Sequence, residues 1–355
     1  MGLNILITVL LSLSISIFTT YNVIRFSKHL NLGDAPSEAR KIHKIKIPNF
    51  GGIAVFIATM VAYFTFSDYS NTIRPDRLFT ISIFLFFIGM ADDMDGISPG
   101  SRLIMEFLCA FFIIAVADIR LTTLWGIFGI TDLPIVASYI ITSLFIVGCI
   151  NAYNMIDGID GLLGSLSLLG SACFGFIFYS EGEWLWTILC AAICGALAGF
   201  LYYNRYPAKI FMGNGGSLFL GTIFACFSVR MMQIEPTHEG IIYITAPNTM
   251  VFSIIAIPVI DMIATFAIRI YYGDSPFEAD QCHIHHRMMT MGLNQNQTCL
   301  IIILLNIFIM VFAYFVQDTG VLRSLFYTIL FCVVLESIIV YFSLFYKKGG
   351  LSKNI

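Results

Sequence analysis

The stretch TCLIIILLNIFIMVFAYFV, residues 298–316, contains no charged residue along its whole length. An α-helix needs about 20 predominantly apolar residues to cross the hydrocarbon core of a bilayer, so this stretch predicts a transmembrane helix. The rest of the 355-residue chain has the same character, with 58% hydrophobic and 12% charged residues. Soluble domains carry roughly 25% charged residues. The composition therefore excludes a soluble globular domain and a disordered chain.

Comparable apolar runs predict an all-α, polytopic integral membrane protein with about 11 (10–11) transmembrane helices. The runs lie near 3–24, 50–66, 78–91, 103–117, 133–150, 161–180, 184–203, 214–232, 249–270, 298–316 and 321–346. The first run lacks a basic segment in front of it, which is typical of a true span rather than a cleaved signal peptide. Gly195 and Gly199 are spaced for close packing of two membrane helices. No internal repeat divides the chain, so residues 1–355 are expected to form a single transmembrane domain.

Lys and Arg residues are distributed unequally between the two sides of these helices. Alternating the spans places 14 of the 19 basic residues on one side, and loops rich in Lys and Arg are typically cytoplasmic. An odd number of spans separates the termini, so we expect a periplasmic N-terminus and a cytoplasmic C-terminus. The cytoplasmic loops predicted in this way lie near 25–49, 92–102, 151–160, 204–213 and 271–297. A formal net charge of −3 argues against nucleic-acid binding.

These loops contain the unusual polar clusters of the chain. Asp92 and Asp93 are adjacent at the end of a predicted span, where two like charges beside lipid repel each other and lose solvation. A divalent cation relieves both costs, and Mg²⁺ prefers carboxylate oxygens and substrate phosphates as ligands. The pair therefore favours a metal–phosphate site, with helix capping as the alternative.

The other clusters also fit phosphate chemistry. The segment GNGGS, residues 213–217, opens a predicted helix, where backbone N–H groups can approach an anion. The last loop contains a basic cluster of His283, His285, His286 and Arg287. These histidines are spaced too tightly for a typical zinc site, so phosphate binding is the better interpretation. Together the clusters predict chemistry on phosphates at the cytoplasmic membrane surface, with one substrate from water and one from lipid.

Two motifs are specific enough to indicate a family. The pattern Asn-x-x-Asn-x-x-Asp-Gly-x-Asp-Gly-Leu spans residues 151–162, and His-Ile-His-His spans residues 283–286. With these motifs the chain resembles the polyprenyl-phosphate N-acetylhexosamine-1-phosphate transferase family over almost its whole length. Ile-Pro-Val-Ile-Asp-Met at 257–262 and Ser-Pro-Phe at 275–277 extend the resemblance to the bacterial undecaprenyl-phosphate branch.

The resemblance implies an enzyme of the bacterial inner membrane whose active site faces the cytoplasm. It implies transfer of N-acetylglucosamine 1-phosphate from the UDP-sugar to undecaprenyl phosphate, with release of UMP. This would be the first membrane step of O-antigen or cell-envelope polysaccharide synthesis. Mg²⁺ or Mn²⁺ is the implied cofactor, and the implied partners are the UDP-N-acetylhexosamine, undecaprenyl phosphate and membrane lipid, with a homodimer left open.

Other donors and a different class of protein are alternatives to this interpretation. UDP-linked GalNAc, FucNAc or QuiNAc are alternative donors. A lipid or solute transporter is the non-enzyme alternative, but its charges should lie near the middle of the membrane, where we expect only Asp261.

The resemblance also implies roles for individual residues. Catalytic roles are expected of Asp92, Asp93, Asp157 and Asp160. Metal ligation is expected of Asp93, Asn154 and Asn214. Substrate binding is expected of His43, Lys44, Asn151, Arg269, His283, His285, His286, Arg287, Gly213 and Ser217.

One position departs from the family pattern, which places a metal-binding Asp after Phe-Met-Gly. This chain has Asn214 there. An amide oxygen can still coordinate Mg²⁺, but it brings no negative charge, so metal binding should weaken. We expect an active enzyme with a raised demand for metal, and a low-activity or regulatory paralogue is the alternative.

Overall fold

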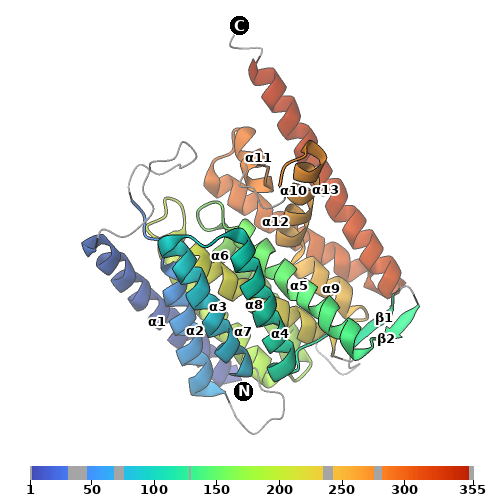
Figure 1. Cartoon of the computed structure of the whole chain (residues 1–355), viewed down its shortest axis with the longest axis horizontal. Helices are drawn as coiled ribbons and strands as arrows, with labels where there is room; N and C mark the ends of the chain where they lie inside the picture. Colours follow the sequence, from blue (N-terminus) through green and yellow to red (C-terminus); the bar gives the residue numbers. More distant parts are fainter. Residues whose placement is uncertain are drawn as a thin grey trace.

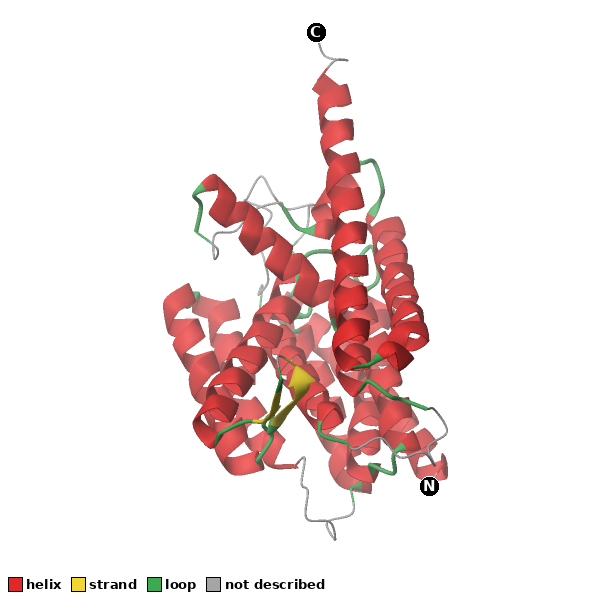
Figure 2. Ribbon diagram, turned by 90° about the vertical axis from the view of Figure 1, so that its right-hand side faces the viewer, coloured by secondary structure: helices red, strands yellow, loops and turns green. Residues whose placement is uncertain are grey.

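The structure is a computed structural model that describes residues 2–30, 46–67, 76–127, 129–234, 243–275 and 282–351. It consists almost entirely of α-helices that stand side by side in a bundle (Figures 1 and 2). The helices are α1 (Gly2–His29), α2 (Gly51–Phe66), α3 (Asp76–Asp95), α4 (Pro99–Ala117), α5 (Ile135–Met155), α6 (Leu162–Ser180), α7 (Trp184–Asn204), α8 (Gly213–Met232), α9 (Pro247–Ile254), α10 (Ala256–Tyr272), α11 (Ile284–Thr290), α12 (Gln295–Val316) and α13 (Val321–Leu351). The 3₁₀ turn Gln317–Thr319 follows α12, and the strands are β1 (Thr123–Ile127) and β2 (Ile130–Asp132).

The helices coincide with the apolar runs of the sequence. Within the described ranges, eight helices are long and apolar enough to cross a membrane, or nine if α9 and α10 form one bent span. The apolar helix α2 is shorter, with 16 residues. Each predicted run overlaps a helix or the α9–α10 pair, which confirms the all-α polytopic membrane architecture. Helix α1 begins and α13 ends at opposite ends of the bundle (Figure 1); the number of spans and the sides of the termini stay predictions.

The run at 249–270 does not form one straight helix as predicted, because α9 and α10 are bent by 72° relative to each other. Pro258 lacks the N–H group that would donate to the Ile254 carbonyl, and this interrupts the helical ladder. Asn306 of α12 donates its amide to the carbonyl oxygens of Ser253 and Ile254 at 3.5 and 3.4 Å. The backbone groups at the bend are therefore satisfied inside the bundle.

A two-stranded antiparallel hairpin of β1 and β2 separates α4 from α5, and the all-α prediction did not include it. Gly126 and Gly129 have φ angles of 79° and 77°, which a glycine adopts without steric cost. The hairpin lies in the half of the bundle where α1 begins (Figures 1 and 2). It is therefore remote from the polar loops at the other end.

Small residues bring α1 and α7 into backbone contact, as the spacing of Gly195 and Gly199 predicted. A Cβ at Gly195 would overlap the hydroxyl of Ser12, and a Cβ at Gly199 would lie 2.8 Å from the Leu13 carbonyl oxygen. Close approach of this kind is how membrane helices gain packing energy without a hydrophobic driving force between them.

Glycines also let the first turn of α8 enter deeply between α2 and α3. Gly52 of α2 packs against the backbone of Gly216. Gly89 of α3 packs against the backbone of Asn214, where an added Cβ would lie 2.6 Å from the carbonyl carbon. This packing brings the N-terminus of α8 beside the last turn of α3, which carries the adjacent aspartates.

Candidate active site

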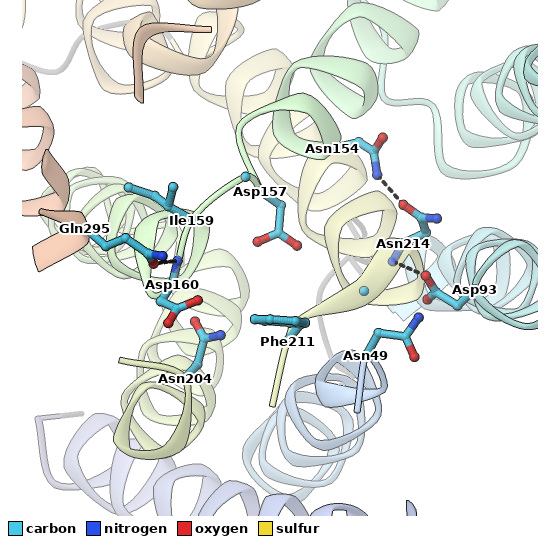
Figure 3. A pocket seen from close by; sticks show the side chains of 12 residues that line it. Asn49, Asp93, Asn154, Asp157, Ile159, Asp160, Asn204, Phe211, Asn214 and Gln295 are labelled. Carbon is cyan, nitrogen blue, oxygen red and sulfur yellow. Dashed lines mark hydrogen bonds between the residues drawn. The ribbon is translucent and has the colours of Figure 1, made fainter. Parts of the chain in front are cut away.

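A polar cavity of about 330 Å³ lies at one end of the bundle, where α3, α5 and α7 end and α8 and α12 begin (Figure 3). Its lining residues are Asn49, Asp93, Asn154, Asp157, Gly158, Ile159, Asp160, Asn204, Phe211, Gly213, Asn214 and Gln295. Segments far apart in the sequence therefore share one cavity, as the assignment of the polar loops to one side predicted.

Asp93, in the last turn of α3, caps the N-terminus of another helix. Its Oδ1 accepts a hydrogen bond from the backbone N–H of Asn214 at 2.9 Å, and its Oδ2 accepts one from the N–H of Gly215 at 3.2 Å. Both donors belong to the first turn of α8, where N–H groups have no partner within the helix. The helix dipole adds to their effect, so a negative charge is stabilised at the cavity wall. The capping alternative holds for Asp93, which also lines the cavity.

Asp92 acts on the cavity indirectly, because its carboxylate does not line it. Its Oδ2 accepts a hydrogen bond from Asn214 Nδ2 at 3.0 Å and lies 3.4 Å from a terminal guanidinium nitrogen of Arg102. Its Oδ1 accepts a hydrogen bond from the backbone N–H of Ile97 at 2.6 Å. The two adjacent aspartates thus have different surroundings, and Asp92 holds the side chain of Asn214 in place.

Asn214 in turn contacts the end of α5. Its Oδ1 accepts a hydrogen bond from Asn154 Nδ2 at 2.8 Å, and the same nitrogen donates to Ser217 Oγ at 2.8 Å. The two amides predicted as metal ligands therefore lie next to each other on the cavity wall (Figure 3). Ser217 is fully buried behind them.

Asp157 lies in the loop between α5 and α6 and points into the cavity (Figure 3). Within the described part of the chain its carboxylate has no hydrogen-bond or ion-pair partner. Burial, followed by the negative charges of Asp93 and Asp160, raises the pKa of Asp157 to about 7. A carboxyl group that titrates near neutral pH is suited to take up and release a proton, so Asp157 is the acid best placed for proton transfer.

Asp160 is fixed by contacts that join the loop to α7 and α12. Its Oδ2 accepts a hydrogen bond from the N–H of Ala208 at 2.9 Å, and its own N–H donates to Gln295 Oε1 at 3.0 Å. The next residue, Gly161, donates its N–H to Asn204 Oδ1 at 3.1 Å. These bonds fix the loop between α5 and α6, which carries Asp157, at the wall of the cavity.

The histidine-rich segment forms the short helix α11 beside α10. His283 Nδ1 lies 2.8 Å from Asp261 Oδ2, and the N–H of Ile284 donates to Asp261 Oδ1 at 2.7 Å. Asp261 is 2% exposed, and these contacts of its carboxyl group fasten α11 to α10. An acid held in this way does not serve as an open coupling site, which argues against the transporter alternative.

His285 packs against the loop that carries Asp157, outside the cavity lining. It is 1% exposed, and neither ring nitrogen has a hydrogen-bond partner among the residues described. Its ring meets Gly158, where an added Cβ would overlap Nε2. Burial, followed by the neighbouring His286 and His283, lowers the pKa of His285 well below its usual 6.5. A neutral His285 therefore packs against the loop instead of facing the cavity.

The glycosyl transferase family 4 model matches residues 77–232, a segment that carries most of the cavity residues. The undecaprenyl-phosphate alpha-N-acetylglucosaminyl 1-phosphate transferase of Salmonella typhi is 35% identical over 302 residues, which are 82% of this chain and 79% of that protein. The chain belongs to glycosyl transferase family 4. The protein of the same name from Escherichia coli K12 is 34% identical over 303 residues, with the same coverage. That from Yersinia pestis is 34% identical over 283 residues, 78% of this chain and 74% of the relative.

In this family 4 glycosyl transferase, the structure brings together part of the predicted site. The predicted residues that line the cavity are Asp93, Asn154, Asp157, Asp160, Gly213 and Asn214. The predicted residues outside its lining are Asp92, Asn151, Ser217, Arg269, His283, His285, His286 and Arg287. Asn151 is buried and donates its amide to Glu106, and Arg287 Nε donates to the Cys282 carbonyl at 2.7 Å. His43 and Lys44 lie outside the described residues.

The cavity also contains residues that were not among the predicted site residues, namely Asn49, Gly158, Ile159, Asn204, Phe211 and Gln295. Three of them have neutral amide side chains, which a search for clusters of charged residues does not detect. Gln295 had one local signal, because Asn294 and Gln297 form a capping box that starts α12 beside it.

The contact between Gly158 and His285 leads to a prediction for this family 4 enzyme. Gly158→Ala should lower the transferase rate by about 10- to 100-fold, because the new methyl group displaces the loop that carries Asp157. Adding His285→Ala should restore much of the rate, since the space is then free. Rates of the single and double variants in detergent check this, with Gly148→Ala as control because a Cβ there meets open space. A double variant slower than Gly158→Ala would show that His285 has a direct role at the substrate.

Proposed function

We propose that this protein transfers N-acetylglucosamine 1-phosphate, or a related N-acetylhexosamine 1-phosphate, from the UDP-sugar to undecaprenyl phosphate. The products are undecaprenyl-diphosphate-N-acetylhexosamine and UMP. The names of the relatives support the lipid acceptor and the transferred group, and the polar end of the bundle supports a reaction at the membrane surface. We place this end at the cytoplasmic face of the bacterial inner membrane, following the distribution of Lys and Arg.

One observation carries the proposal: three carboxylates, those of Asp93, Asp157 and Asp160, line one cavity of about 330 Å³ beside two adjacent amides. Such a cluster is costly without a cation, and the raised pKa of Asp157 shows the cost. Phosphoryl transfer needs a divalent cation and positioning groups more than covalent chemistry from the protein. The cavity supplies these groups.

The donor set fits Mg²⁺ or Mn²⁺. Asp93, Asn154 and Asn214 would hold the ion through carboxylate and amide oxygens, which are ligands that Mg²⁺ accepts together with substrate phosphates. Among the residues that the structure describes, no group of three His, Cys, Asp or Glu side chains is placed to hold a metal, so the proposed site depends on the amides. When bound, the ion would neutralise charge on the diphosphate.

The protein side chains supply positioning and proton transfer. An oxygen of undecaprenyl phosphate attacks the sugar-bearing phosphorus of the UDP-sugar, the bond between the two phosphates breaks, and UMP leaves. Asp157 takes the proton of the acceptor phosphate, because its carboxylate is free of hydrogen bonds within the described chain. Asp93 stays bound to the backbone N–H groups of Asn214 and Gly215, and Asp92 holds the side-chain amide of Asn214.

Purified protein incubated with labelled UDP-sugar, undecaprenyl phosphate and Mg²⁺ tests the proposal directly. We expect labelled lipid and UMP in equal amounts, with UDP-N-acetylglucosamine preferred over the GalNAc, FucNAc and QuiNAc donors. The same mixture without undecaprenyl phosphate is the control and should release no UMP. Absence of labelled lipid with all four donors would refute the proposed function.

A further inference from the structure

A chain of polar side chains runs from the cavity wall into the membrane-spanning part of the bundle. Arg102 and Glu106 stand one turn apart in α4, between Asp92 of α3 and Asn151 of α5. Neither Arg102 nor Glu106 lines the cavity. The proposed reaction assigns no role to either residue.

The contacts along this chain are continuous. A terminal guanidinium nitrogen of Arg102 lies 3.4 Å from Asp92 Oδ2, and its Nε lies 3.5 Å from Glu106 Oε1. Asn151 Nδ2 donates to Glu106 Oε2 and to the Val147 carbonyl, the latter at 2.9 Å. One guanidinium therefore bridges two carboxylates that belong to different helices.

Stability alone gives a weak reason for this arrangement. Glu106 is fully buried, and the part of α4 that follows it is entirely apolar. A well-packed hydrophobic residue in place of a buried ion pair is often neutral or stabilising. Ionisable residues inside membrane helices are expensive and are usually tied to function. The position of Glu106 therefore points to a role for its partner Arg102.

The contacts between Asp92 and Asn214 indicate what this role is. Asp92 Oδ2, which Arg102 approaches, is the same oxygen that accepts from Asn214 Nδ2 at 3.0 Å. Because the nitrogen of the Asn214 amide is bound to Asp92, its Oδ1 faces Asn154 at the cavity wall. Moving Asp92 would thus reorient the amide pair without touching the substrate.

We propose that Glu106 and Arg102 are positioning residues that hold Asp92 against Asn214 and thereby fix the amide pair of the cavity. The inference rests on the proposed function for its effect on rate. Mutation of a residue that orients a metal ligand without binding the metal typically lowers metal affinity or activity by about 10- to 100-fold. Glu106 acts through Arg102, and Asn151 holds Glu106.

A double-mutant cycle tests the inference. Arg102→Met should lower kcat by about 10- to 100-fold and raise the Mg²⁺ concentration for half-maximal rate, with little change in KM for the UDP-sugar. In an Asp92→Asn background the same change should cost less than about 2-fold, because Asp92 no longer transmits it. Equal losses in both backgrounds would overturn the inference.

Two further variants separate positioning from packing. Arg102→Lys keeps the charge but not the planar fork that reaches both carboxylates, so its kcat should fall between those of the wild type and Arg102→Met. Cys109→Ala, one turn beyond Glu106 in α4 and also buried, removes packing alone and should leave kcat and metal dependence unchanged. A loss in Cys109→Ala as large as that in Arg102→Met would show that α4 is merely fragile.

Mn²⁺ binding, followed by electron paramagnetic resonance of the purified protein, distinguishes failure of this inference from failure of the proposed function. Arg102→Met should weaken Mn²⁺ binding about 10-fold in the wild-type background. In the Asp92→Asn background it should not change Mn²⁺ binding further. This result would uphold the positioning role even if no UDP-sugar were a substrate. Unchanged Mn²⁺ affinity in Arg102→Met would refute it.

Discussion

Asp157→Asn is expected to lower kcat by about three orders of magnitude, within the range that general acid–base groups contribute. The reason is geometric. Asp93 is bound to the N-terminus of α8 and Asp160 to the Ala208 N–H, whereas the Asp157 carboxylate has no such partner in the described chain. Initial rates of lipid labelling at saturating Mg²⁺ measure the loss. More than a tenth of the wild-type rate in Asp157→Asn would assign the proton transfer to another group.

The pH dependence gives a second measurement on the same residue. Burial and the charges of Asp93 and Asp160 raise the pKa of Asp157 to about 7, so in the metal-free protein it is mainly protonated below that pH. Since the ionised form is needed, kcat/KM should rise with pH through this region at low Mg²⁺. Added Mg²⁺ favours the ionised form and should move the rise to lower pH. Asp160→Asn should retain the rise, and Asp157→Asn should lose it.

Asn214→Asp is expected to lower the Mg²⁺ concentration for half-maximal rate by about 10-fold, because charge on the ligands strengthens binding of a hard cation. The same change should destabilise the metal-free protein. Asn214 Nδ2 now donates to Asp92 Oδ2 at 3.0 Å, and a carboxylate there would place two negative charges in contact. Melting temperature in chelator should fall relative to wild type and recover with Mg²⁺.

A matched control shows whether location matters or only added charge. Asn204 lines the same cavity but contacts Gly161 instead of the amide pair, so Asn204→Asp adds a carboxylate away from the proposed ligands. It should change the Mg²⁺ demand much less than Asn214→Asp. If Asn214→Asp leaves the Mg²⁺ demand unaltered, position 214 is not a metal ligand in this enzyme.

Much of the architecture could be predicted because the bilayer imposes a simple rule on sequence. Uncharged runs mark helices, and the remaining charges collect where the chain meets water. The amino-acid sequence alone was enough to place Asp93, Asn154, Asp157 and Asn214 together, since their loops fall on one side. The bend at Pro258 and the hairpin between α4 and α5 were missed, because both depend on how neighbouring segments satisfy backbone groups.

The roles of individual acids could not be predicted in the same way. Asp92 and Asp93 are adjacent and chemically identical, yet one contacts a side chain and an arginine while the other caps α8. This difference arises from glycine packing between α3 and α8, which brings together residues more than a hundred positions apart. The buried partner Glu106 was missed because it lies inside an apolar run, where a single acid does not alter the prediction of a helix.

The cap that Asp93 provides for α8 links occupancy of the cavity to the thermodynamics of the whole bundle. Both oxygens of this carboxylate already bind backbone N–H groups of α8, and α8 is the most deeply buried of the described spanning helices. A cation that binds Asp93, with or without a diphosphate bound to the cation, requires the folded arrangement of α3 and α8 and should therefore raise the melting temperature. Heat resistance in detergent becomes a ligand sensor for this protein, readable for any nucleotide sugar, inhibitor or metal without a turnover assay.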